Sequence, residues 1–343
     1  MMSNEINLGL VGFGNVGQGL ASIIKNNKEK LQEAGVNPKI VAISDSQKGS
    51  IYHPEGFNPA LLLETIQKKR SLEELEADYK GWSAQEMIEK GKIDVMVELA
   101  PTDLETGEPA FTHMKTALNK GVHVITTNKG PIALHYETLR EISEKTGAQL
   151  RVEGTVMSGT PTLITAQESL KASNITKIEG ILNGTTNYIL TRMEEGLAYE
   201  KALEEAQELG YAEADPTGDI EGVDPAGKVV ILANLLMGQK FKMKDVFTKG
   251  ITDVTQEDMK EANKNNKKIK LLGRLIYDTA GWKGEVKPIQ LDNSHPLANV
   301  SGATNAITFS TEILGDITVI GPGAGRLETG YSVIEDLIAI GNK

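Results

Sequence analysis

The chain has 343 residues and a formal net charge of −11, from 36 basic and 47 acidic side chains. This excess of acid disfavours nucleic acid or an anionic membrane as the main partner, although it leaves room for a local phosphate pocket. The chain contains no cysteine, which excludes disulfides, thiolate metal ligands and a cysteine nucleophile, and therefore aldehyde oxidation through a thiohemiacetal.

The length predicts two domains, and a hydrophobic content of 39% is enough for buried cores. No apolar run approaches the roughly 18 residues that a membrane span needs. The first residues are polar and acidic, without the basic and apolar regions of a signal peptide. We therefore expect a cytoplasmic protein.

In the first 150 residues, short apolar runs alternate with longer amphipathic ones. Strands that alternate with helices predict an α/β fold built on a doubly wound parallel sheet. A stretch with glycine, proline and asparagine, 49–59, predicts an exposed loop. The predicted strands are 6–11, 39–44, 93–99, 122–126 and 149–153, and the predicted helices are 16–30, 109–119 and 131–145.

The pattern changes after about residue 153, where helices and isolated strands mix and indicate a second, mixed α/β domain. A strand at 317–320 and a closing helix at 328–340 follow, and we assign this last segment to the first domain. The predicted boundaries are thus 1–153, 154–315 and 316–343. The predicted helices of the second domain are 161–172, 186–195, 198–209 and 224–237, and its strands are 175–182, 268–277, 286–290 and 306–310.

A glycine-rich motif, Gly12-Phe13-Gly14-Asn15-Val16-Gly17, directly follows the first strand and opens the first helix. This G-x-G-x-x-G pattern is weak alone, but between a strand and a helix it predicts a dinucleotide site. Gly12 allows the tight turn, Gly14 lets the backbone approach a pyrophosphate, and Gly17 lets the helix pack on the sheet. The helix N-terminus offers N–H donors to the phosphates.

The second strand runs into Ser44-Asp45-Ser46-Gln47-Lys48. An acid at this point bonds the ribose 2′-hydroxyl of NAD, whereas cations and hydroxyls accommodate the 2′-phosphate of NADP. Both kinds of side chain are present, so NAD and NADP both stay open. Ala100 and Thr102 follow the third strand, where open sheets place their ligands.

The densest polar cluster is 210–228, in which five carboxylates and one lysine precede an apolar helix. Asp224 and Lys228 are four residues apart, so they share a helix face. This arrangement suits a reacting site, and it equally suits a surface capping segment with an ordinary ion pair.

Two further segments follow predicted strands. Lys129 lies where cofactor and substrate meet in an open sheet, although a lone lysine there is more often a solvated charge. The segment Asn183-Gly184-Thr185-Thr186-Asn187-Tyr188 enters a helix. Its N–H groups suit a carboxylate ligand, and a plain helix cap is as good an explanation.

Together these segments resemble homoserine dehydrogenase, in the family's order and over nearly the whole chain. The chain is similar to the short form, without the C-terminal regulatory domain or a fused aspartate kinase. One departure lies in the acidic cluster, where Gly218-Asp219 stands in place of the paired aspartates of some relatives. The segments that carry the resemblance are 12–17, 127–131, 153–161, 180–188, 210–228, 323–325 and the closing helix.

The resemblance implies interconversion of L-homoserine and L-aspartate 4-semialdehyde with NAD or NADP, on the route to threonine and methionine. It implies Lys228 as the catalytic lysine, Lys129 as a second lysine for proton transfer or cofactor contact, and Asp224 as a required acid. It also implies a homodimer joined through the second, substrate-binding domain. The implied substrate-binding residues are Gly184, Thr185, Tyr211, Glu213 and Asp219.

The resemblance also places Gly325 near the nicotinamide and a monovalent cation, usually sodium, at Glu153 and the carbonyls of Val156, Ser158 and Thr160. With the motif residues, the predicted cofactor-binding residues are Gly12, Phe13, Gly14, Asn15, Val16, Gly17, Ala100, Thr102, Lys129 and Gly325.

The chemistry of these side chains agrees with the resemblance. Homoserine is a zwitterion, so its ammonium suits Glu213 and Asp219, and its carboxylate suits the N–H donors at Gly184 and Thr185. One acid–base group must reach the reacting oxygen, and Lys228 can serve if desolvation or a second cation lowers its pKa.

Two alternatives remain: another two-domain dehydrogenase of a small amino or hydroxy acid, and a dinucleotide sensor without activity. The five histidines lack ligand spacing, which disfavours a zinc alcohol dehydrogenase.

Overall fold

The computed structural model describes residues 4–341 and divides the chain into two compact units. Unit 1 runs to Gly159 and resumes at Gly325, and unit 2 is Thr160–Ala324. Both boundaries lie later than the predicted ones at 153 and 315. Among the described helices, none is both long and apolar enough to cross a membrane.

Unit 1 is a seven-stranded sheet in the order β4-β3-β2-β1-β5-β6-β7. Strands β2, β1, β5, β6 and β7 are parallel neighbours, while β3 and β4 form an antiparallel edge. This arrangement confirms the predicted doubly wound, Rossmann-like fold. The strands are β1 (Asn4–Val11), β2 (Val36–Asp45), β3 (Gly49–Tyr52), β4 (Tyr79–Lys80), β5 (Val95–Glu98), β6 (His123–Thr126) and β7 (Leu150–Arg151).

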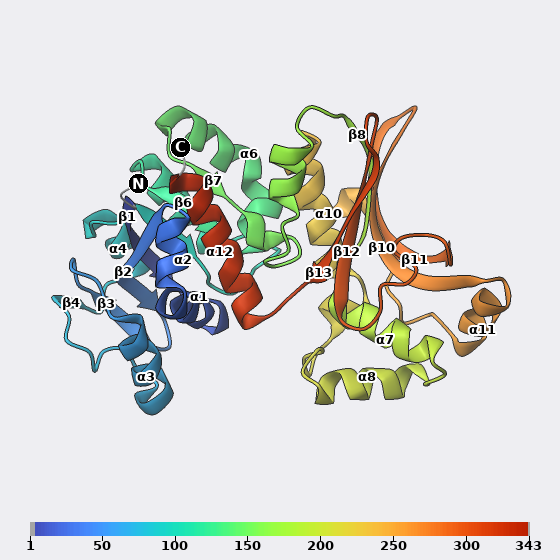
Figure 1. Cartoon of the computed structure of the whole chain (residues 1–343), viewed down its shortest axis with the longest axis horizontal. Helices are drawn as coiled ribbons and strands as arrows, with labels where there is room; N and C mark the ends of the chain where they lie inside the picture. Colours follow the sequence, from blue (N-terminus) through green and yellow to red (C-terminus); the bar gives the residue numbers. More distant parts are fainter. Residues whose placement is uncertain (1–3, 342–343) are drawn as a thin grey trace. The chain divides into compact units, whose positions relative to one another are not determined.

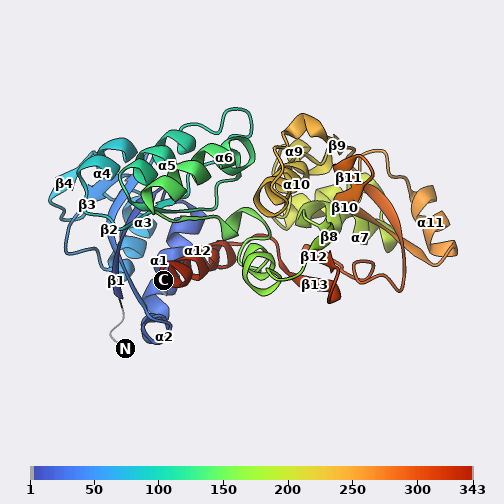
Figure 2. The ribbon, with the colours of Figure 1, turned by 90° about the horizontal axis from the view of Figure 1, so that it is seen from above.

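Helices cover both faces of this sheet. Figure 2 shows α4, α5 and α6 along one face, with α1 and α12 along the other. Helices α1 and α12 pack with their backbones in contact, because a Cβ on Gly330 would lie 2.7 Å from the Leu20 nitrogen. The helices of unit 1 are α1 (Asn15–Asn26), α2 (Lys28–Glu33), α3 (Pro59–Lys69), α4 (Ala84–Lys90), α5 (Ala110–Asn119), α6 (Lys129–Thr146) and α12 (Arg326–Gly341).

Several local predictions for unit 1 were wrong. The predicted loop 49–59 contains β3, because residues 49–52 pair with the end of β2. The predicted helix 16–30 is two helices that meet at Asn27. The predicted strand 149–153 shrinks to β7, and Glu153 begins the 3-10 turn Glu153–Thr155. Helices α3 and α4 were not predicted.

Unit 2 is a six-stranded sheet in the order β13-β12-β8-β10-β11-β9, antiparallel except for the pair β11–β9. Helix α7 packs against β10 and β12, and α10 packs against β10 and β11 (Figure 1). The strands are β8 (Ile175–Ile181), β9 (Val246–Thr248), β10 (Lys267–Asp278), β11 (Gly281–Asp292), β12 (Thr304–Thr311) and β13 (Gly315–Pro322). The helices are α7 (Gly184–Glu194), α8 (Tyr199–Glu208), α9 (Thr217–Ile220), α10 (Val223–Leu236) and α11 (Gln256–Lys264).

Three predictions for this unit need correction. Residues 316–322 do not return to unit 1, because β13 pairs along its whole length with β12. The predicted helix 161–172 contains the π-helical turn Thr165–Ser169. The predicted strand 286–290 is part of the longer β11, which forms a hairpin with β10.

Candidate active site

In unit 1, the glycine motif lies at the point where the strand order reverses, between β2 on one side of β1 and β5 on the other. Open α/β sheets bind ligands at this point. Gly12 has a φ of +95°, and a Cβ there would lie 3.0 Å from the Leu99 carbonyl oxygen, so the turn requires glycine. Gly14 precedes α1 without a side chain to cap it, and the first turn of α1 carries no acidic residue.

The end of β2 is tied to this motif by Asp45. Its Oδ2 accepts the Phe13 N–H at 2.7 Å, and its Oδ1 accepts the N–H groups of Gln47 and Lys48, each at 2.9 Å. The Lys48 Nζ lies 3.6 Å from Oδ2. Burial alone would raise the pKa of Asp45, but these hydrogen bonds and the Lys48 charge outweigh it and hold the pKa below its usual value. The carboxylate therefore stays charged at neutral pH.

The ends of β5 and β6 are joined by Asn128, which caps α6. Its Nδ2 donates to the carbonyls of Ala100 and Pro101 at 3.1 and 3.2 Å, while its Oδ1 accepts the Gly130 N–H. Lys129 is the first residue of α6. The structure thus brings the predicted residues Ala100 and Lys129 to the same end of the sheet.

In unit 2, a hydrogen-bonded network surrounds Lys228, whose side chain is only 8% exposed. Its Nζ donates to the Leu182 carbonyl at 2.6 Å and to Asp224 Oδ2 at 2.8 Å. The Asn183 side chain links the two acids, because its Nδ2 donates to Asp219 Oδ1 at 2.7 Å and to Asp224 Oδ2 at 3.0 Å. A routine surface ion pair is therefore excluded for Asp224 and Lys228.

Of the other predicted substrate residues, Thr185 and Tyr211 meet at the start of α7. Thr185 donates through Oγ1 to the Tyr211 carbonyl at 2.7 Å, and the rings of Tyr188 and Tyr211 are 4.9 Å apart. The Glu213 side chain is exposed, and in the described part of the chain it makes no hydrogen bond with the Lys228 network.

The sequence interpretation missed Asn183 and the Leu182 carbonyl as members of the site. The signal for Asn183 was present, since it precedes a helix, but that position predicted only a cap. It does cap α7 through Oδ1, which accepts the Thr186 N–H at 2.9 Å. Its Nδ2 adds the link between the acids, which no local pattern reveals.

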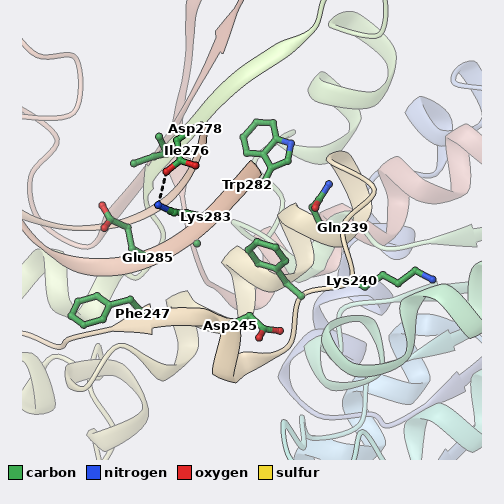
Figure 3. A pocket seen from close by; sticks show the side chains of 11 residues that line it. Gln239, Lys240, Asp245, Phe247, Ile276, Asp278, Trp282, Lys283 and Glu285 are labelled. Atoms are coloured by element: carbon green, nitrogen blue, oxygen red, sulfur yellow. Dashed lines mark ion pairs between the residues drawn. The ribbon is translucent and has the colours of Figure 1, made fainter. Parts of the chain in front are cut away.

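Unit 2 also has a surface cavity of about 760 Å³, beyond the C-terminal end of α10 and beside the β10–β11 hairpin. Figure 3 shows the Trp282 ring and the ion pair between Lys283 and Asp278, which are 2.5 Å apart. The cavity contains none of the predicted site residues.

A doubly wound sheet with this glycine turn, together with a buried lysine that is hydrogen-bonded to an aspartate, defines a dinucleotide-dependent dehydrogenase. Two family models match the chain: "Homoserine dehydrogenase, NAD binding domain" over residues 12–153 and "Homoserine dehydrogenase" over residues 161–338. The chain belongs to the homoserine dehydrogenase family. Homoserine dehydrogenase activity with NAD or NADP follows from this membership.

Individual relatives agree. The chain is 42% identical to an NAD(+)-dependent homoserine dehydrogenase of Pseudomonas canavaninivorans, over 98% of this chain and 96% of that protein. A putative homoserine dehydrogenase from Archaeoglobus fulgidus has a similar structure, with a TM-score of 0.88 and 36% identity over 98% of this chain and 99% of that one. A hyperthermophilic archaeal homoserine dehydrogenase in complex with NADPH has a TM-score of 0.84 and 32% identity. The match covers 98% of this chain and 97% of that one.

Proposed function

We propose that the chain interconverts L-homoserine and L-aspartate 4-semialdehyde with Lys228 as the acid–base group. The observation that carries this assignment is the buried Lys228 amino group, whose Nζ is held between the Leu182 carbonyl and Asp224. Bound NAD(P) supplies the acceptor or donor of the hydride. When homoserine is oxidised, the neutral Lys228 amine takes the proton of the substrate hydroxyl and becomes an ammonium. When the aldehyde is reduced, that ammonium donates the proton to the developing alkoxide and returns to the amine.

The neighbouring residues hold the substrate and the lysine. Asp224 and the Leu182 carbonyl accept hydrogen bonds from Nζ and fix its position. Gly184 and Thr185 begin α7, whose N–H groups and helix dipole favour the substrate carboxylate. Asp219, held by Asn183, and the exposed Glu213 supply negative charge for the substrate ammonium.

Absorbance of the reduced cofactor tests the reaction directly, with homoserine as substrate and with NAD and NADP in parallel. We expect turnover with homoserine. Turnover of other hydroxy acids with none of homoserine would favour the more general dehydrogenase, and cofactor binding without any turnover would favour the sensor.

For the cofactor we propose a preference for NAD. The fixed, charged Asp45 carboxylate lies at the end of β2, where it suits a ribose hydroxyl and repels a 2′-phosphate. The residue Lys48 nearby already pairs with Asp45, which weakens its attraction for a second anion.

Replacement of Asp45 with serine is expected to lower the ratio of kcat/KM for NAD to that for NADP by about tenfold or more, which corresponds to removal of about 1.4 kcal/mol of repulsion. Steady-state kinetics with both cofactors measure this ratio. A general disturbance of the glycine turn would lower kcat/KM for both cofactors alike and would leave the ratio unchanged. Lys48→Ala is the companion variant. A wild-type protein that prefers NADP and loses this preference in Lys48→Ala would overturn the proposal.

We also propose a monovalent cation at Glu153, with carbonyls of Val156 and Ser158. Burial, and then the charge of Glu153, raise the pKa of Asp336 and raise that of Glu335 to about 7. Oε2 of Glu335 is buried without a hydrogen-bond partner. Glu153, Glu335 and Asp336 thus place three carboxyl groups close together, and a bound cation would favour their charged forms. Thr160 begins unit 2, and its carbonyl stays a prediction.

Sodium is therefore expected to stabilise the protein. The melting temperature of the wild type should be higher in sodium chloride than in choline chloride at equal ionic strength, since a ligand of the folded state stabilises it. Glu153→Gln should lose this difference. Equal melting temperatures of the wild type in the two salts would contradict the site.

The homodimer joined through the second domain and the cytoplasmic location stay predictions. Analytical ultracentrifugation of the purified chain would test the homodimer.

A further inference from the structure

A lysine that the reaction does not use is buried in unit 2. Lys270, on β10, is 1% exposed, and its Nζ donates to the Val300 carbonyl at 2.7 Å and to Asn187 Oδ1 at 3.3 Å. Within residues 4–341, no carboxylate lies within ion-pair distance of this ammonium. Burial of an unpaired cation costs free energy of folding. A lysine at this position therefore suggests a role beyond packing.

The two acceptors of Lys270 belong to a clamp around the segment 300–304. Nδ2 of Asn187, on α7, donates to the carbonyls of Val300, Gly302 and Thr304 at 3.2, 3.0 and 3.1 Å. Farther along α7, Thr191 Oγ1 accepts the Gly302 N–H at 3.1 Å. Lys270 thus donates hydrogen bonds both to Asn187 on α7 and to the segment 300–304, which Asn187 also binds. These contacts link the segment to α7.

The clamped segment packs against the first residue of α7. A Cβ on Gly184 would lie 2.6 Å from the Ala303 carbonyl oxygen, so backbone meets backbone at this point. Asn187 is in the same helix, one turn beyond Asn183. A shift of the clamped segment would therefore move the N-terminal turn of α7, which contains Gly184 and Thr185.

We propose that Lys270 is a positioning residue for the substrate carboxylate: it fixes the N-terminal turn of α7 through Asn187 and the segment 300–304, and adds a buried positive charge beside that helix. The proposal rests on the proposed function, which assigns Gly184 and Thr185 to the carboxylate. It locates the effect of Lys270 in homoserine binding, and neither in the proton transfer at Lys228 nor in cofactor binding.

The charge state of Lys270 gives a second readout. Burial lowers its pKa, Glu194 on α7 raises it and Lys268 on β10 lowers it, with a resulting pKa of about 8. Glu194 and Lys268 pair with each other at 2.9 Å. The ammonium is therefore charged at pH 7 and mostly neutral at pH 9.5, so its contribution to binding should fade over this range.

The test compares three variants by steady-state kinetics of homoserine oxidation. Lys270→Met keeps the volume but removes the charge and the donors; Lys270→Arg keeps a charge; Lys268→Met is the matched control on the same strand. At pH 7, Lys270→Met should raise the KM for homoserine about tenfold, the effect of losing one charged hydrogen bond. Its kcat should stay within about threefold, and its KM for the cofactor should not change.

Lys270→Arg should recover part of this loss, and Lys268→Met should leave all three constants unchanged. The ratio of the homoserine KM of Lys270→Met to that of the wild type should fall towards one at pH 9.5. If Lys270→Met does not fold, Lys270→Arg carries the test, because its homoserine KM alone should rise.

An unchanged homoserine KM with a lower melting temperature would show that Lys270 serves stability alone and would overturn the inference. So would a parallel change of kcat and of both KM values. A wild-type protein without homoserine turnover would instead contradict the proposed function.

Discussion

Lys228→Met is expected to lower kcat by about 10²–10⁴-fold while NAD(P) still binds, because the variant loses the group that we propose exchanges a proton with the substrate oxygen. Methionine fills the buried space without a charge or a donor, so the fold should persist. The loss of kcat should be specific to this position, since the Lys228 Nζ is held between the Leu182 carbonyl and Asp224. Single-turnover rates and cofactor titration measure the two parts of this expectation separately.

The matched control is Lys249→Met, also in unit 2. Lys249 is exposed, and its Nζ lies 3.3 Å from a carboxylate oxygen of Asp253, four positions along the chain. Exposed ion pairs of this kind contribute little to stability. The Lys249→Met variant should therefore have the kcat of the wild type. Near-normal turnover by Lys228→Met would remove the lysine from the mechanism and leave the dinucleotide fold intact.

Gly14→Val is the second change with a large expected effect, and it acts on the cofactor. A Cβ on Gly14 meets nothing within 4 Å, and its φ of −74° is open to any residue, so the fold should tolerate the substitution. The side chain would occupy the space through which the backbone approaches the pyrophosphate. We expect the affinity for NAD to fall by about 100-fold or more, equivalent to about 2.7 kcal/mol, with an unchanged melting temperature.

Gly17→Val provides the contrast within the same motif. A Cβ there would lie 2.9 Å from the Gly12 carbonyl oxygen and 3.3 Å from the Phe13 ring, so this variant should lose stability as well. Calorimetric titration with NAD and thermal unfolding distinguish the two variants. Normal NAD affinity in Gly14→Val would mean that the glycine turn holds no dinucleotide.

Local patterns predicted the parts of the molecule whose signals lie within a few residues. The strand β1, the glycine turn and the start of α1 follow from an apolar run, a motif and a helix period that adjoin one another. The spacing of Asp224 and Lys228 likewise predicted a shared helix face, and the structure gives them a direct contact of 2.8 Å. Where the local signal was weak, the predictions were less accurate: the predicted loop 49–59 contains β3, and the predicted helix 161–172 is shorter and includes the π-helical turn Thr165–Ser169.

The sequence by itself determined the family and the doubly wound fold, and it supplied the residues of the candidate site, because glycines, strand ends and helix spacing act over short stretches of chain. Only the tertiary structure decided how those residues are held. Asn183 reaches Asp219 and Asp224 across 36 and 41 positions, Asp45 meets Phe13 across 32, and Lys270 meets Asn187 across 83. Such contacts depend on which strands become neighbours and on how the helices pack against them. A pattern of a few adjacent residues predicts neither the strand order nor the helix packing.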